Sequence, residues 1–141
     1  MLLKFKKLHP DAILPTKGTE HSAAVDLFSI ETVDIPGNTF YKVNTGLSVE
    51  IPIGYFGLVA PRSGKATKEG LILRSSNYVD ADYRGPIMIC CFALGVEKLH
   101  IEKGERIAQM AIIPIPQLEI EWAEKLSETN RGNGGFGSTG K

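Results

Sequence analysis

The chain is cut into short β-favouring segments by glycine, proline and asparagine, with a break at roughly every tenth residue. This spacing leaves little room for long amphipathic helices and is typical of β-sandwiches, jelly rolls and barrels. Between two glycines, residues 65–69 form one short helix-compatible stretch. We predict strands at residues 2–8, 24–28, 32–35, 39–44, 46–51, 55–60, 71–73, 78–80, 87–94, 107–113 and 117–122. The sequence therefore predicts an all-β jelly roll or β-sandwich with one short helix.

The domain organisation follows from length and from a change of composition near the C-terminus. With 141 residues the chain suits one domain with its own core. The run at residues 87–94 is almost continuously apolar, which predicts a strand buried on both faces. From residue 127 onward the chain is polar and glycine-rich, without apolar periodicity. We expect a β domain at residues 1–126 and a flexible C-terminal tail at residues 127–141.

Charge and cysteine content narrow the class of protein. Lysine plus arginine and aspartate plus glutamate number 16 each, so the formal net charge is zero. Such a chain has no bulk electrostatic reason to bind nucleic acid or an anionic membrane. No apolar run is long enough for a signal peptide or a membrane span. Cys90 and Cys91 are neighbours in a predicted strand and face opposite ways, which disfavours a disulfide between them and indicates two small core residues. A reducing, cytoplasmic compartment is the expectation.

Residues 77–85, NYVDADYRG, gather two carboxylates, two phenols and a guanidinium. If this stretch is extended, Asp80 and Asp82 point to one side and Tyr83 to the other. Asp80 is a candidate base that positions and deprotonates a water, and Tyr83 offers a flat face to a sugar ring. The alternative is a polar edge strand whose acids are simply solvated.

Residues 61–64, PRSG, lie where a strand ends and the short helix begins. Ser63 is a residue type that caps helices, and the free N–H groups of a helix start bind anions. Arg62 adds a fork that can hold two phosphate oxygens. An ordinary capped turn with a surface arginine is the alternative.

Two further polar residues stand inside predicted strands. Gln109 alternates with Ile107, so we expect it among core positions, where a buried amide must be hydrogen-bonded or face a polar site. Asp26 lies in a strand of small residues and could orient an arginine or metal-bound waters. The alternative for both is a bond to nearby groups with a structural role only.

The tail at residues 131–140, RGNGGFGSTG, holds five glycines and is costly to order. It nevertheless carries an arginine, an aromatic ring and a Ser-Thr pair. Phe136 could stack on a base while Arg131, Ser138 and Thr139 reach phosphates, which suits a lid over a nucleotide. A floppy terminus is the alternative.

Five segments, in this order and at this spacing, resemble the five motifs of the trimeric dUTP pyrophosphatases (dUTPases). They are SAAVDL at 22–27, PRSG at 61–64, NYVDADYRG at 77–85, GERIAQM at 104–110 and RGNGGFGSTG at 131–140. The resemblance implies a jelly-roll homotrimer whose three active sites each combine all three chains. Such enzymes hydrolyse dUTP to dUMP and pyrophosphate with Mg2+, which limits uracil incorporation into DNA and supplies dUMP for dTMP synthesis.

For the nucleoside, the resemblance implies that Asp80 activates the water and bonds the sugar 3′-hydroxyl. Tyr83 would pack beneath the deoxyribose and exclude a 2′-hydroxyl. Main-chain groups of the hairpin would read the uracil edge, with one further residue lining the pocket; these residues are Asn77, Tyr78, Val79 and Met88.

For the phosphates, the resemblance implies contacts from Arg62, Ser63, Gly64 and Gln109. Asp26 would support the water shell of the metal, whose main ligands are substrate phosphates, or a neighbouring arginine. The tail would close over the nucleotide, with an aromatic stacked on uracil and polar groups on the γ-phosphate; its residues in these roles are Arg131, Phe136, Gly137, Ser138 and Thr139.

The sequence departs from the family pattern at three positions. Ala24 and Asn77 replace glycines, and Asn77 tolerates a positive φ better than other residues with a side chain. Lys65 stands where an apolar residue is common, and we expect it to add charge near the phosphates. Two alternative functions remain: a regulatory nucleotide-binding protein on the same scaffold, and a dCTP deaminase. The deaminase needs a glutamate near the pyrimidine, and residues 86–90 offer no acid.

Overall fold

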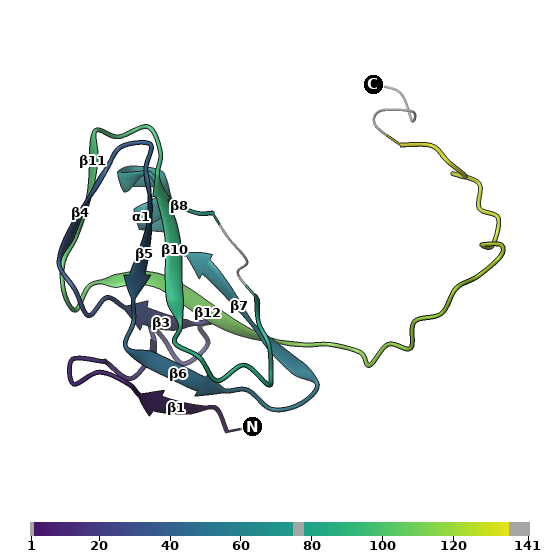
Figure 1. Cartoon of the computed structure of the whole chain (residues 1–141), viewed down its shortest axis with the longest axis horizontal. Coiled ribbons are helices and arrows are strands. Elements are labelled where there is room, and N and C mark those ends of the chain that lie inside the picture. Colours follow the sequence, from purple (N-terminus) through teal and green to yellow (C-terminus); the bar gives the residue numbers. More distant parts are fainter. Residues whose placement is uncertain (1, 75–77, 136–141) are drawn as a thin grey trace.

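The computed structural model describes residues 2–74 and 78–135. Figure 1 shows the path of the chain through its labelled elements. In chain order the elements are β1 (Lys4–Lys7), β2 (Thr16–Lys17), β3 (Val25–Phe28), β4 (Val33–Pro36), β5 (Phe40–Asn44), β6 (Leu47–Glu50), β7 (Tyr55–Pro61), α1 (Ser63–Glu69), β8 (Leu71–Leu73), β9 (Tyr78–Val79), β10 (Met88–Ala93), β11 (Lys98–Ile101) and β12 (Arg106–Pro114).

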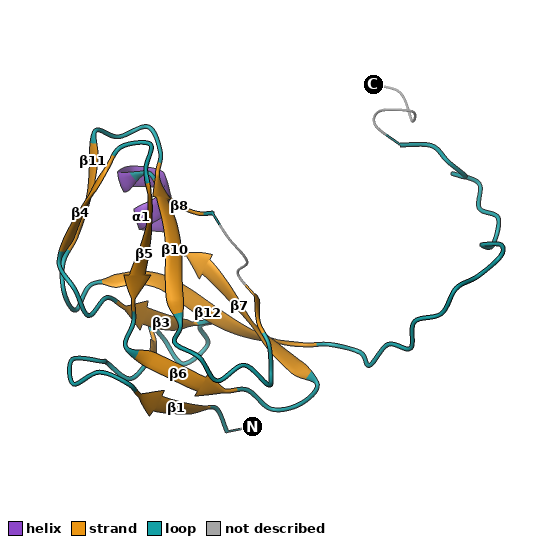
Figure 2. Ribbon diagram, viewed as in Figure 1, coloured by secondary structure: helices purple, strands orange, loops and turns teal. Residues whose placement is uncertain are grey.

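The strands form antiparallel sheets packed around one core. A five-stranded sheet has the order β2-β3-β12-β7-β9, and a three-stranded sheet has the order β5-β10-β8. Strands β1 and β6 pair with each other, as do β4 and β11. Figure 2 shows that the regular structure is strand apart from one short helix. The core side chains are fully buried, among them Leu27, Val43, Leu71, Ile89 and Ile107. The prediction of an all-β fold with one short helix is confirmed.

Strand β10 corrects the prediction of burial on both faces. Its side chains alternate: those at positions 89, 91 and 93 are buried, and those at 88, 90 and 92 are half-buried. The strand lies between β5 and β8, and only one face of that sheet is turned to the core. On the other face, the Arg74 guanidinium lies 5.6 Å from the ring centre of Phe40 and 5.8 Å from that of Phe92. Cation–π contacts of this kind cover the outer face in part.

Strands β2 and β11 are absent from the prediction. β2 has two residues, too few to carry a pattern. β11, with the sequence KLHI, alternates exposed and buried side chains and pairs with β4. The alternation of polar and apolar residues in KLHI is the pattern that predicts this strand. It is missed when only the apolar content is considered, because lysine and histidine are polar.

The strand predicted at residues 117–122 is wrong for the single chain. After β12 the described segment forms neither helix nor strand, and it extends away from the sheets (Figure 1). Leu118 is 76% exposed, Ile120 93% and Trp122 100%. An alternating pattern becomes a strand only beside a partner strand, and in the described part of this chain none pairs with these residues. The boundary predicted at residue 127 stays a prediction.

The helix content bears on membrane insertion. Over residues 2–74 and 78–135, α1 is the one helix, and its seven residues are too few to span a bilayer.

Candidate active site

A β-bulge in β12 decides which side chains reach the outer face of the five-stranded sheet. Arg106 is opposite Phe28, but Ala108 is already opposite Leu27, so β12 holds one extra residue there. Ile107 and Ala108 are consequently both buried, and the alternation restarts one residue later. Gln109, opposite Asp26, therefore lies on the outer face together with Arg106. The prediction that Gln109 shares a face with Ile107 is wrong because of this bulge.

Asp26 is the charged centre of that outer face. Its side chain is 9% exposed, and its two oxygens contact two arginines. Arg62 Nε lies 3.1 Å from Oδ1, and Arg106 Nη1 lies 3.4 Å from Oδ2. A nearly buried carboxylate needs such partners to offset its lost hydration. Asp26 thus fixes both guanidinium groups beside the pocket.

A pocket of about 500 Å³ opens over this part of the sheet. Helix α1 supplies Ser63 and Gly64 at its rim, and Gln109 reaches it from β12, where its amide donates to the Pro61 carbonyl at 3.3 Å. The helix starts two residues earlier than predicted, so the N-cap is Arg62, which makes no side-chain capping bond. The prediction of Ser63 as the cap is wrong. The residues shared by this pocket and the prediction are Asp26, Arg62, Ser63, Gly64 and Gln109. Ala24 and Lys65, two of the departures from the family pattern, also line it.

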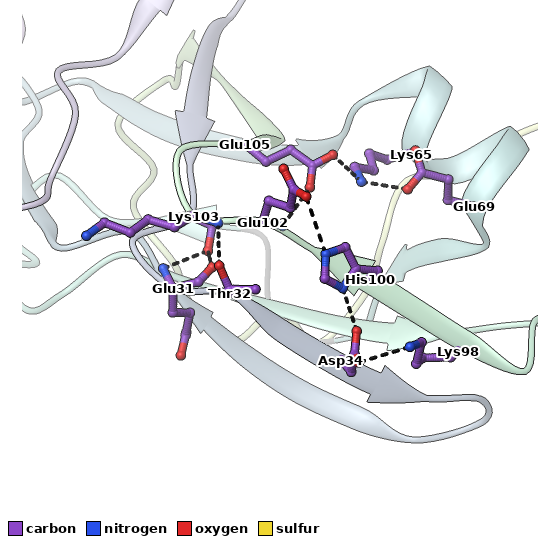
Figure 3. Close-up of polar contacts among 11 residues, drawn as sticks. Glu31, Thr32, Asp34, Lys65, Glu69, Lys98, His100, Glu102, Lys103 and Glu105 are labelled. Atoms are coloured by element: carbon purple, nitrogen blue, oxygen red, sulfur yellow. Dashed lines mark hydrogen bonds and ion pairs between the residues drawn. The ribbon is translucent and has the colours of Figure 1, made fainter.

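Lys65 does not act as a free charge beside this pocket. It is 6% exposed, and its ammonium group contacts the carboxylates of Glu69, at 2.6 Å, and of Glu105. Two carboxylates against one ammonium group leave no surplus positive charge, contrary to the prediction. Figure 3 shows Lys65 between the two glutamates.

A second pocket, of about 200 Å³, contains the other predicted residues. It is lined by Tyr78, Val79, Asp80, Tyr83 and Met88. The strand expected at residues 78–80 ends at Val79, and a turn follows in which the Tyr83 N–H donates to the Asp80 carbonyl at 3.1 Å. The stretch is therefore not extended, and Asp82 is exposed and does not line the pocket. The turn separates the two acids that a straight strand would have put on one side.

The turn is stabilised by its own side chains. Arg84 Nη1 donates to the carbonyls of Ala81, at 2.6 Å, and Tyr83, at 2.9 Å. The Tyr83 hydroxyl donates to the Pro86 carbonyl at 3.1 Å. A Cβ on Gly85 would overlap the Tyr83 ring, so glycine is required for this ring position. The half-exposed tyrosine face is thereby held beside Asp80.

Strand β7 lies between the two pockets. Leu58 and Ala60 line the larger pocket, and Val59 between them lines the smaller one. Successive side chains of a strand point to opposite faces, so the pockets open on different sides of β7. They share no residue among those described. One chain therefore presents the two groups of predicted residues in different directions.

The tail contributes to neither pocket in the described structure. Arg131 is exposed, and its Nε donates to the Gly134 carbonyl at 2.8 Å. The remaining predicted residues, Asn77, Phe136, Gly137, Ser138 and Thr139, lie outside the described residues.

The charged groups offer no ready-made metal cage. Over residues 2–74 and 78–135, no group of three or more histidine, cysteine, aspartate or glutamate side chains is placed to hold a metal ion. Asp26 is the one described carboxylate that lines the larger pocket. Magnesium keeps several waters and binds through one or two carboxylates plus substrate phosphates, so this donor set fits a metal carried mainly by phosphate oxygens.

Arg106 and Glu105 are the functional candidates that sequence reasoning missed. In a regular strand Arg106 and Gln109, three residues apart, point to opposite faces. Only the bulge brings Arg106 and Gln109 to the same side, and no residue type in this stretch predicts a bulge. Glu105 faces Lys65 across 40 positions of sequence, a pairing that a single sequence does not reveal.

Comparison with known proteins gives the family. A family model described as dUTPase matches residues 10–140. The deoxyuridine 5'-triphosphate nucleotidohydrolase of Nautilia profundicola is 46% identical over 142 residues, covering 100% of both chains. A mutant dUTPase of Staphylococcus bacteriophage 80alpha, solved with dUpNHpp, superposes with a TM-score of 0.89 at 30% identity, covering 99% of both chains. A mutant dUTPase from phage phi11 of S. aureus, described with a structural Mg(II) ion, gives 0.83 at 25% identity, over 89% of this chain and 98% of that one. This chain belongs to the dUTPase family.

Proposed function

We propose that this chain hydrolyses dUTP to dUMP and pyrophosphate. Its relatives carry the name of that activity over their full length. The observation that carries the proposal is the presence of two pockets, one with a carboxylate beside an aromatic face and one with Arg62 and helix-start groups. The first chemistry suits a nucleoside and an attacking water, and the second suits a triphosphate.

The smaller pocket is the proposed nucleoside site. Asp80 takes a proton from water as the water oxygen bonds to the α-phosphorus; the bond to the β-phosphate oxygen breaks, and pyrophosphate leaves. Tyr83 lies beneath the deoxyribose, where its fixed ring leaves no room for a 2′-hydroxyl. Uracil is read by main-chain groups at Tyr78 and Val79, with Met88 at the side. The exposed position of Asp80 beside this ring supports these roles.

The larger pocket is the proposed phosphate site. Arg62, held by Asp26, presents its remaining N–H groups to phosphate oxygens, and Ser63, Gly64 and Gln109 add donors around it. Because Asp26 pre-orients the guanidinium, less side-chain freedom is lost when the substrate binds.

Mg2+ is the proposed cofactor. When bound, it offsets charge on the triphosphate and the leaving pyrophosphate. Asp26 would contact its water shell, with substrate phosphates as the main ligands. The structural Mg(II) ion of the phage phi11 relative supports a metal in this family.

We propose that the active protein is a homotrimer with shared sites. The two pockets of one chain open on different sides of β7, so a nucleotide spanning both kinds of chemistry needs a second chain. The tail, with Arg131, Phe136, Gly137, Ser138 and Thr139, is the proposed lid from a third. Since dUTP belongs to the nucleotide pool, we propose a cytoplasmic location.

A pyrophosphate-release assay with dUTP, dTTP, dCTP and UTP tests the proposal. We expect turnover of dUTP alone. Asp80→Asn should lower kcat by about 10²–10⁴-fold, the usual contribution of a general base, while nucleotide still binds. Asp82→Asn is the matched control, because it removes the same charge two residues away outside the pocket. Comparable turnover of dCTP, or full activity in Asp80→Asn, contradicts the assignment.

A further inference from the structure

Helix α1 is attached to the fold by charge instead of by apolar packing. Its sequence is SGKATKE, with one alanine and no larger apolar side chain. Its only buried residue is Lys65. A helix normally packs an apolar stripe against its neighbours, and this one has none. The burial and ion pairs of Lys65 are therefore its main anchor.

The two ion pairs of Lys65 connect different parts of the structure. Glu69 lies four residues on in the same helix, so that pair stabilises α1 itself. Glu105 belongs to the turn before β12 and contacts the same ammonium group. The Glu105 pair is thus the one that joins the helix to another segment (Figure 3).

Glu105 is in turn fixed within its own segment. Its carboxylate accepts the Glu102 N–H at 3.0 Å, and its carbonyl accepts the Ser29 N–H at 2.9 Å. It directly precedes Arg106, which contacts Asp26, and the bulge that turns Gln109 into the pocket. A shift of Glu105 would therefore move the start of β12.

The protonation states suit a lasting ion pair. Burial pushes the pKa of Lys65 down, but its bonds to Glu105 and Glu69 outweigh this and leave the pKa above its usual value. Burial pushes the pKa of Glu105 up, and the bonds from Lys65 and the Glu102 N–H bring it below its usual value. Both groups are charged at neutral pH, as an ion pair requires.

We propose that Lys65 is a positioning residue for triphosphate binding: through Glu105 it holds the PRSG segment, at the start of α1, in register with the start of β12. Both segments carry donors that line the larger pocket, Arg62 and Ser63 on the first and Gln109 on β12. Lys65 also lines this pocket, but its ammonium group is paired with the carboxylates of Glu69 and Glu105, so its proposed role is to position these donors. The proposal rests on the phosphate role given to this pocket above.

A double-mutant cycle with steady-state kinetics tests it. Lys65→Met and Glu105→Gln should each raise the KM for dUTP about tenfold, with kcat within about threefold of wild type, since binding is lost more than chemistry. The double variant should match the singles, because both remove one shared interaction. Lys68→Met, an exposed charge on the same helix, is the matched control and should leave KM unchanged.

A ligand without phosphates distinguishes a specific loss of phosphate binding from a general loss of structure. The inhibition constant of deoxyuridine should stay at the wild-type value in Lys65→Met, whereas a disturbed fold would raise it with the KM. Where Lys65→Met fails to fold, Glu105→Gln carries the test, because Glu69 still partners the buried ammonium group. An unchanged KM in Glu105→Gln, or additive effects in the double variant, overturns the proposal.

The Arg62→Gln variant distinguishes an error in the positioning role of Lys65 from an error in the assignment of the phosphate site. If Arg62→Gln raises the KM and the Lys65 and Glu105 variants do not, the positioning role alone is wrong. If none of the three changes the KM, the phosphate site has been assigned to the wrong pocket.

Discussion

We predict that mixed trimers of two variants, each inactive alone, regain part of the dUTP-hydrolysing activity. We expect Asp80→Asn, in the proposed nucleoside pocket, and Arg62→Gln, in the proposed phosphate pocket, each to lower the rate of dUTP hydrolysis by about 100-fold or more. Because the pockets open on different sides of β7, each site of the proposed homotrimer would take them from two different chains. A site in a randomly mixed trimer is intact when its nucleoside chain is the Arg62 variant and its phosphate chain the Asp80 variant. At equal amounts this holds for about one quarter of the sites.

The assay is pyrophosphate release after the two variants are unfolded together and refolded as a mixture. We expect about one quarter of the wild-type rate per chain, against near-zero rates for each variant refolded alone. As a control, wild type co-refolded with the doubly substituted chain should give about one quarter of the all-wild-type rate if sites are shared and about one half if each chain is self-sufficient. Activity of the mixture no higher than that of its parents would refute the shared site.

Three other predictions follow from charge and burial. Asp26→Asn should lower the free energy of unfolding by about 2 kcal/mol, less than for a fully buried ion pair because both arginines are partly exposed to water; chemical denaturation measures this, and an unchanged midpoint contradicts it. Burial raises the pKa of Cys91 to about 11, so a thiol reagent at neutral pH should label Cys90 alone in the native protein, and more slowly with dUMP bound because Cys90 lines the smaller pocket; labelling of both thiols would be evidence against this packing. The bond to Asp34 raises the pKa of His100, so its stabilisation is complete below about pH 6.5 and is lost as pH rises through the higher folded-state value; the melting temperatures of wild type and His100→Gln should therefore differ at low pH and converge at high pH.

The sequence predicts most strands because their patterns are local. The predicted ranges 39–44 and 55–60 lie within one residue of β5 and β7, because turn residues bound both strands on either side. It also predicts residues that line the two pockets, because Asp80, Arg62 and Gln109 stand in distinctive motifs.

What the sequence does not predict depends on contacts between distant residues. The bulge that puts Arg106 and Gln109 on one face arises from pairing with β3, not from a local signal. The turn after Val79 depends on contacts made by Arg84 and on the absence of a side chain at Gly85. A prediction from strand alternation takes no account of these contacts, so it places Asp80 and Asp82 on the same side. The sequence alone gives no sign that Lys65 is buried and paired with Glu105, because the two residues are far apart in the chain.

The exposed segment after β12 has a consequence for spectroscopy. Trp122 is the only tryptophan in the chain, and it stands on this segment, not in the β core. Its emission therefore reports the surroundings of the C-terminal segment. A denaturation curve followed by tryptophan fluorescence would record the release of that segment from whatever it contacts, while circular dichroism would record the loss of the sheets. Two midpoints from the two signals would mean that the segment detaches while the fold is still intact.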